Sequence, residues 1–229
     1  MHTPTENVFH LHGAALQMKA NEGACELLAG MGVAVTPSGA VVMKDWNKAE
    51  KAYIHHSSEP VAAVAYALVS PTFGKGKLPD YLLSDLIRKS GCTDYSEIAA
   101  FANLCGCHGI PLERSTRYFC EHLHAVIDRY ELGIFFAKGQ RRIQYIDVRP
   151  TGYEDPKALT AWRKAYMEAP EATKILVASI LWLYRGRLDD KHWMNRLPRK
   201  WHAVDAVTKL RSAGMLDDWG RLYTLYAGW

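Results

Sequence analysis

The residue types best suited to chemistry are cysteines and histidines near the middle of the chain. Cys105 and Cys107 flank Gly106, and Cys120 and His124 stand four positions apart. On a helix, residues four apart lie on one face, so this thiolate and this imidazole could share a tetrahedral zinc ion. Cys105 and Cys107, in the turn before that helix, would complete the coordination. This interpretation predicts a closed structural zinc site with no open position for catalysis.

The same residues also suit plain packing. Two cysteines separated by one residue are less common in structural zinc sites than two separated by two. Cysteine is also among the residues most often buried; Cys105 ends an apolar helix and Cys120 follows Phe119. Both interpretations stay open at the level of the sequence. The five cysteines are an odd number, which argues for reduced thiols rather than a disulfide framework.

No familiar catalytic arrangement accompanies these residues. His55 and His56 stand near Glu59, but adjacent helical residues point about 100° apart and no second ligand pair is recognisable. The nucleophile elbow, the metalloprotease helix, the kinase glycine loop and the deaminase zinc signature are all absent from the sequence. We therefore expect a non-enzymatic protein. The alternative is a nuclease whose catalytic residues come from distant segments.

Basic residues are the second group with a clear chemistry. They gather between 185 and 200, and others are predicted on a hairpin tip and on outward helix faces. Such side chains bind phosphates with an affinity that falls as salt rises and with little choice of sequence. A formal net charge of +4 and a pI near 8.7 are compatible with a nucleic-acid partner. The candidate nucleic-acid-binding residues are Arg114, Arg117, Lys138, Arg141, Arg142, Arg196, Arg199, Lys200, His202, Lys209 and Arg221.

The last third of the chain must position many of these residues. Apolar spacing predicts a helical bridge over 151–170 and helices over 171–184, near 191–197 and over 200–213. The helix over 200–213 has an apolar stripe of Ala203, Val204, Val207 and Leu210, and an outward face of His202, Asp205, Lys209 and Ser212. After Gly214, two β-type runs at 215–216 and 221–226 flank a polar turn, which predicts an aromatic hairpin.

A helix pair that leads into a hairpin resembles the winged helix-turn-helix of DNA-binding proteins. The resemblance is one of element order and covers about a quarter of the chain. It implies that the helix over 200–213 faces a DNA groove and that Arg221 on the wing contacts phosphate or the minor groove. Asp205 on the outward face opposes phosphate, although an acid can accept a hydrogen bond from cytosine. The alternative is an ordinary solvated face, or a module that binds protein.

The middle of the chain has a similar order of elements. Helices are predicted over 81–89, 95–104 and 111–131, followed by a hairpin of 134–137 and 142–148 whose tip carries Lys138, Arg141 and Arg142. The chain thus resembles two winged-helix modules in tandem, an arrangement similar to that of plasmid replication initiators. The two halves share no alignable sequence repeat.

The N-terminal part is expected to form a small α/β unit. A helix is predicted over 14–30, a hairpin over 33–43 and a helix over 60–69, before a linker rich in Gly, Pro and Lys at 70–79. We predict three domains: an α/β unit at 1–75, a winged-helix-like module at 76–150 and a winged-helix module at 151–229. The fold class is α+β and mostly helical.

No apolar run approaches the roughly 20 residues of a membrane helix, and the N-terminus lacks the pattern of a signal peptide. We expect a cytoplasmic protein without a membrane partner and with no cofactor apart from the zinc. The leading hypothesis is a winged-helix protein that binds double-stranded DNA in transcriptional control or in replication of a plasmid or phage. RNA is the alternative nucleic acid, and a homodimer or protein partners are compatible. The alternative function is a non-catalytic nucleic-acid-binding subunit of a larger nucleoprotein or defence-related complex.

Overall fold

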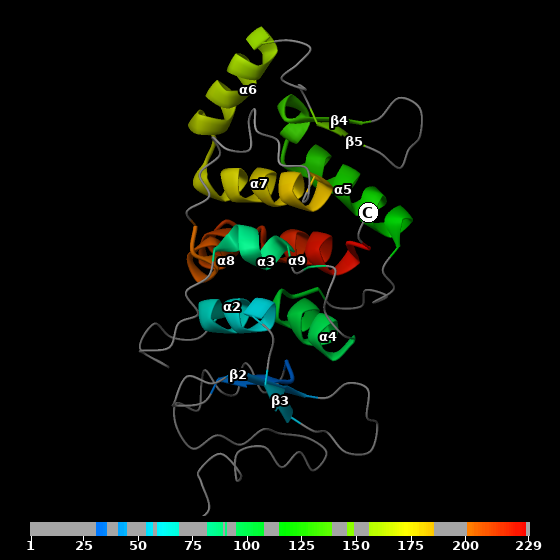
Figure 1. The fold of residues 1–229 in the computed structure, drawn as a ribbon, viewed down its shortest axis with the longest axis vertical. Helices are drawn as coiled ribbons and strands as arrows, with labels where there is room; N and C mark the ends of the chain where they lie inside the picture. The colour runs from blue at the N-terminus through cyan, green and yellow to red at the C-terminus, as the bar shows by residue number, and fades with distance from the viewer. Residues whose placement is uncertain are drawn as a thin grey trace, which may run out of the picture.

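The computed structural model arranges the chain in layers along its long axis (Figure 1). A small sheet lies at one end, successive layers of helices follow, and a helix with a short hairpin lies at the other end. The described part is mostly helical, as the sequence predicts. The structure describes residues 31–35, 41–44, 54–56, 59–68, 82–88, 90, 95–107, 115–138, 146–148, 156–185 and 201–227.

The sheet at one end is antiparallel with strand order β1-β2-β3. It consists of β1 (Val33–Val35), β2 (Val41–Lys44) and β3 (Ile54–His56). The β1–β2 hairpin confirms the expectation from two β-branched runs around a turn signal. His55 and His56 belong to β3, where they pair with the β2 backbone. The helix predicted over 14–30 lies outside the described residues.

Helix α2 (Glu59–Leu68) lies in the layer of helices next to the sheet. Pro60 is tolerated because the first turn of a helix has no partner for its N–H. The helix contacts β1 and β2 on one side and the helices of the next layer on the other. It is therefore apolar nearly all round, with Val61, Ala63, Val64 and Ala65 fully buried.

The middle of the chain has the predicted order of three helices and a hairpin. These elements are α3 (Leu83–Arg88), α4 (Tyr95–Leu104), α5 (Thr116–Arg129), a single 3-10 turn η2 (Leu132–Ile134), and strands β4 (Phe136–Lys138) and β5 (Ile146–Val148), which pair antiparallel. Helix α5 begins later than predicted, at Thr116. Ser115 has an extended backbone and its hydroxyl accepts from the Tyr118 N–H at 3.3 Å, as an N-cap does.

The last third supplies the centre of the core. Helices α6 (Pro156–Glu168) and α7 (Glu171–Arg185) match the predicted helices, and α8 (Ala203–Ser212) begins slightly later than expected. Along α7, Ile175, Leu176, Val177, Ala178, Ile180 and Leu181 are fully buried, which marks a helix enclosed on all sides. The short helix predicted near 191–197 lies outside the described residues.

The hairpin predicted at 215–226 is wrong, because these residues form helix α9 (Leu216–Leu225). Gly214, at φ +69°, ends α8 in a left-handed turn. The Met215 N–H donates to the Leu210 carbonyl at 2.9 Å and the Gly214 N–H to the Arg211 carbonyl at 3.0 Å, the pattern of a Schellman motif. The chain then enters a new helix at once. Helices α8 and α9 are thus a helix-turn-helix pair without the predicted wing.

Helices from all three predicted segments share one apolar core. Helix α2 packs against α4 and α8, and α9 packs against α4, α5 and α7. The domain boundaries at 75 and 150 remain predictions. None of the helices in the described ranges is long and apolar enough to cross a membrane.

Candidate functional site

The outward face of α8 has the exposure that the sequence predicts. Ala203, Val207 and Leu210 are fully buried, and Val204 is half-buried. His202, Asp205, Lys209 and Ser212 are exposed, and so is Arg211. Arg211 also donates to the Ala67 carbonyl at 3.3 Å, which ties α8 to the end of α2. The face therefore combines cations with one acid, Asp205.

Glu171, at the first position of α7, is the charged centre beside this face. Its carboxylate accepts a 2.6 Å hydrogen bond from the indole Nε1 of Trp201. The ammonium groups of Lys209 and Lys174 lie 3.7 and 3.8 Å from its oxygens. The Trp201 hydrogen bond, with the charges of Lys209 and Lys174, lowers the pKa of Glu171 although desolvation opposes the shift.

Trp201 fixes the end of the basic segment on the bundle. Its side chain is buried, its ring packs edge-on against Trp182, and its carbonyl accepts from the Leu83 N–H at 2.9 Å. Arg185, on the other side of the basic segment, is the last residue of α7. The side chain of Trp201 therefore lies along α7, in contact with Glu171 at its first position and with Trp182 near its end.

The other candidate cations are distributed over the fold. Arg117 is exposed on α5 and pairs with Glu121 at 2.8 Å, and Lys138 belongs to β4. Arg221 is half-buried on α9 rather than on a wing, because 221 belongs to a helix. Six candidates lie outside the described residues: Arg114, Arg141, Arg142, Arg196, Arg199 and Lys200.

Helix α9 is a core helix and offers no free face for a groove. Trp219 and Tyr223 are buried, and they donate to the Ser179 hydroxyl at 3.0 Å and to the Leu86 carbonyl at 3.3 Å. Tyr223 also stacks on Phe101 at 4.4 Å between ring centroids. These aromatic side chains pack in the core, so they cannot stack on nucleic-acid bases.

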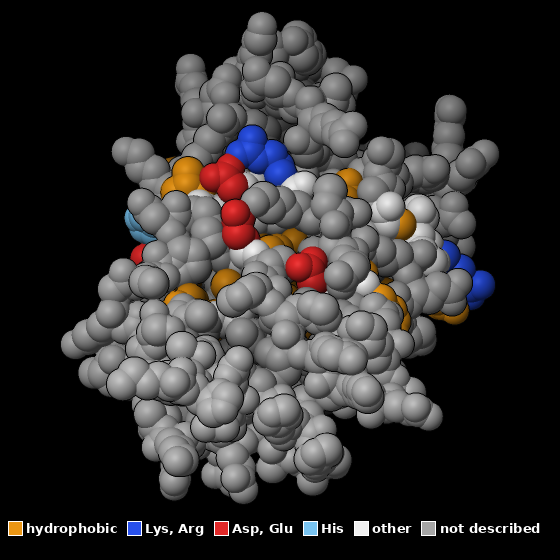
Figure 2. Space-filling model, turned by 60° about the horizontal axis from the view of Figure 1, so that its bottom comes forward, with side chains coloured by type: hydrophobic (Ala, Val, Ile, Leu, Met, Phe, Trp, Pro, Cys, Tyr) orange, Lys and Arg blue, Asp and Glu red, His pale blue; other side chains and the backbone are white. Residues whose placement is uncertain are grey.

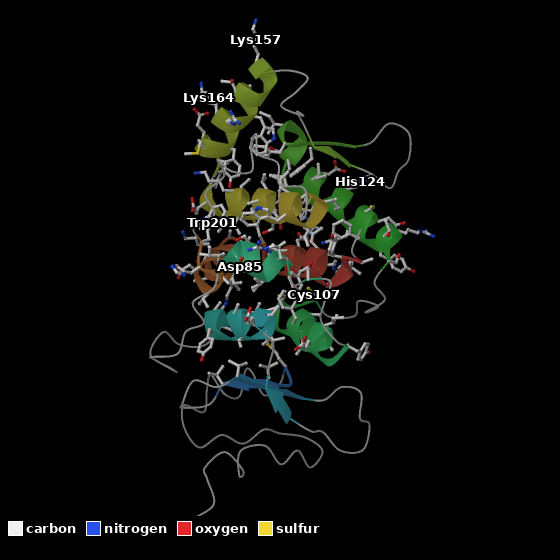
Figure 3. The ribbon with its side chains drawn as sticks, viewed as in Figure 1. Asp85, Cys107, His124, Lys157, Lys164 and Trp201 are labelled. Atoms are coloured by element: carbon white, nitrogen blue, oxygen red, sulfur yellow. The ribbon has the colours of Figure 1, made fainter. Side chains whose placement is uncertain are left out.

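The predicted zinc ligands are not brought together in the structure. Among the described residues no group of three or more His, Cys, Asp or Glu could hold a metal ion, and Cys105, Cys107, Cys120 and His124 are all described. Cys107 lies between α4 and α9 and His124 lies on α5 (Figure 3). The structure therefore does not support the zinc prediction, and packing accounts for these residues.

Helix α9 gives the physical reason, because it fills the space beside the two cysteines. The thiol of Cys107 donates to the Asp217 carbonyl at 3.1 Å, and Gly220 packs against Cys105. Burial raises the pKa of Cys105 well above its usual value and that of Cys107 to about 12, so both remain neutral thiols.

A buried polar cluster joins α5 to the start of α9. The Asp218 carboxylate, on a residue 4% exposed, accepts from Arg129 Nη1 at 2.5 Å and from the Tyr130 hydroxyl at 2.8 Å. The His122 ring nitrogen lies 3.1 Å from the Asp218 carbonyl. Burial and then the Asp218 hydrogen bond raise the pKa of Tyr130 to about 12, while burial lowers the pKa of His122.

The sequence pattern does not single out Glu171, Trp201 or Asp218 as site residues. The sequence contains one signal for Glu171. It stands in the first turn of an apolar helix, where an acidic side chain interacts favourably with the helix dipole. Asp218 follows a glycine stop, which indicates a helix start as well as a turn. On the face drawn in Figure 2, one group of basic side chains lies beside acidic ones, and another basic group lies apart at the right edge.

Known proteins add no residue to these observations. No family model, curated protein or solved structure matches the chain. The candidate site is therefore the α8 face together with Glu171, its donors, and the basic segment that ends at Trp201.

Proposed function

We propose that the protein binds double-stranded nucleic acid, DNA in particular, through phosphate contacts from segment 185–202 and the exposed face of α8. The observation that supports this most is the charge of the segment. It contains six Lys and Arg and two Asp, hence a net charge of +4, which equals that of the whole chain. The remaining residues therefore sum to zero, so attraction to phosphate is concentrated in one place.

The proposed contacts favour affinity over choice of sequence. In a winged helix, the wing follows the helix that enters the groove. In this chain the residues after α8 form the buried helix α9, so they are not available as a wing. Phosphate contacts from Lys and Arg position a protein on a duplex without reading its bases. A role in transcriptional control or mobile-element replication then requires base contacts from the exposed positions of α8, such as His202 and Asp205.

One observation favours the alternative, a nucleic-acid-binding subunit of a larger complex. Lys209, Lys174 and Arg117 each lie beside a carboxylate of the same chain. Paired cations attract phosphate less strongly than free ones. A partner protein that adds its own cations would then be needed for tight binding.

Fluorescence anisotropy with a labelled DNA duplex over a salt series tests the proposal. We expect affinity to fall as salt rises, and the triple variant R196A/R199A/K200A to reduce the slope of log K against log salt by about three. The control variant R88A/K157A/K164A removes the same charge from α3 and α6. Equal slopes for the two variants, or absence of binding by the unchanged protein, would contradict the proposal.

A further inference from the structure

Three N–H donors from separate parts of the chain meet at the Glu171 carboxylate. They are the Trp201 indole at 2.6 Å, the Lys209 ammonium at 3.7 Å and the Lys174 ammonium at 3.8 Å. Trp201 lies between α7 and the layer of α3 and α8 in Figure 3. Two ammonium groups and an indole N–H that point at one oxyanion form a general anion-binding arrangement.

The carboxylate is loosely held by its charged partners. The Glu171 side chain is 45% exposed and that of Lys209 is 47% exposed, so water screens their attraction. Lys174 is better fixed, with a side chain 17% exposed, and Trp201 is buried. Lys174 and Trp201 would therefore stay in place if Glu171 turned away, and together with Lys209 they would present two positive charges and one neutral N–H donor.

A phosphate diester suits these donors better than a single carboxylate does. Its tetrahedral oxygens can accept from donors that approach in different directions, and lysine is a common phosphate ligand. One of the donors, Trp201, directly follows Lys200, the last Lys or Arg of segment 185–202. A duplex backbone bound by that segment passes close to them.

We propose that Lys174, Trp201 and Lys209 form a phosphate-binding position that the Glu171 carboxylate occupies in the free protein and leaves when a duplex backbone phosphate binds. This inference rests on the proposed function and names one residue that regulates it. Glu171 weakens binding, because each duplex must displace it. It also holds the exposed Lys209 ammonium beside the other two donors in the absence of nucleic acid.

The variant E171Q tests the position in the full chain. Glutamine keeps a carbonyl oxygen for the Trp201 indole and removes the charge that competes with phosphate. With a labelled DNA duplex, we expect E171Q to bind about two- to fivefold more tightly at low salt, the range that one exposed ion pair accounts for. The slope of log K against log salt should steepen by about one.

The variant E121Q is the matched control. Glu121 is 52% exposed, pairs with Arg117 at 2.8 Å, and its substitution removes the same unit of charge on α5. An equal gain in affinity for E121Q would overturn the proposal, since net charge alone would explain it. Adding K209A to E171Q should abolish the gain, whereas adding K164A should preserve most of it.

A second measurement does not depend on duplex binding. Pyrophosphate is titrated into the two variants while the indole N–H resonance of Trp201, assigned with W201F, is followed by NMR. We expect a saturable shift in E171Q that is much weaker in E121Q. If the unchanged protein binds the duplex but E171Q shows no gain, the position is overturned and the proposed function stands. If no variant binds the duplex, the proposed function fails, and an unshifted indole resonance then overturns the position as well.

Discussion

Gly220 lets α9 approach the turn after α4 more closely than a side chain allows. A Cβ at this position would lie 2.3 Å from the Cβ of Cys105 and 2.7 Å from its sulfur. We expect Gly220→Ala to lower the free energy of unfolding by about 1–3 kcal/mol, because an overpacked core must shift. Urea denaturation followed by circular dichroism measures the change.

Two other glycines provide controls for this substitution. A Cβ at Gly133 meets nothing within 4 Å, so Gly133→Ala should alter stability by about 0.5 kcal/mol or less. Gly214 also has room, but its φ of +69° disfavours a side chain, and Gly214→Ala should cost about 1 kcal/mol. A cost at Gly220 no larger than at Gly133 would contradict the close packing of α9.

His122 should make stability depend on pH below neutrality. Burial lowers its pKa from 6.5, with the Arg221 and Arg129 charges acting in the same direction and Asp218 opposing them. The unfolded chain therefore binds this proton more readily, so stability should fall as the pH drops below about 6.5. Denaturation midpoints between pH 5 and 8 measure this, and H122Q should flatten the dependence over that window.

Glu171 should affect the pH dependence of stability in a separate, more acidic pH range. Its pKa is lowered from 4.5, so its contribution to stability is present above that pH and is lost as the pH falls below it. E171Q should leave the dependence between pH 5 and 8 unchanged. A flattened profile in E171Q over that range would show that the assignment to His122 is incorrect.

At the scale of elements, docking of α9 should control the reactivity of two cysteines. Cys105 and Cys107 are buried beside α9, and their raised pKa values keep them as thiols. We expect both to resist alkylation in the folded protein and to react in D218N, which removes the carboxylate that joins α9 to Arg129 and Tyr130. Peptide mass spectrometry after timed alkylation at pH 8 separates these cysteines from Cys25 and Cys92. Equal rates in D218N and the unchanged protein would contradict this role of Asp218.

The sequence predicts α8 well and α9 badly for physical reasons. The apolar residues of α8 recur with helical spacing, so its buried and exposed faces follow from the pattern. In α9, aromatic and β-favouring residues such as Tyr223 and Thr224 suggest a strand, while Leu216, Trp219 and Leu222 repeat every three residues. Whether this segment forms a strand or a helix depends on the elements packed around it, since α9 is covered by α4, α5 and α7.

At the scale of the whole molecule, replacing Lys200, His202 and Lys209 together should weaken duplex binding without unfolding the protein. His202 and Lys209 are exposed, and Lys200 stands two positions before His202 in the chain. We expect K200A/H202A/K209A to bind a DNA duplex at least tenfold more weakly at low salt, through the loss of phosphate contacts. Its denaturation midpoint should stay close to that of the unchanged protein. Unaltered affinity would show that the face of α8 is not the binding surface.

The candidate site could be predicted only in part. The exposed side chains of α8 and the basic segment follow from local pattern and composition. The Trp201–Glu171 hydrogen bond joins positions 30 apart, and the Arg129–Asp218 bond joins positions 89 apart. The spacing of residues along the chain does not predict such contacts, because they depend on how the layers of helices pack together. The packing of α2 against α8 was unpredictable for the same reason.

The position of α9 in the core also determines the order in which the protein can fold during synthesis. Helices α4 and α5 end at 104 and 129, whereas the helix that covers both begins at 216. At a synthesis rate of roughly 5–20 residues per second, the ribosome needs on the order of ten seconds to complete that interval. The faces of α4 and α5 that contact α9 lack this partner throughout that time. We therefore expect α4 and α5 to complete their packing only after α9 has been synthesised.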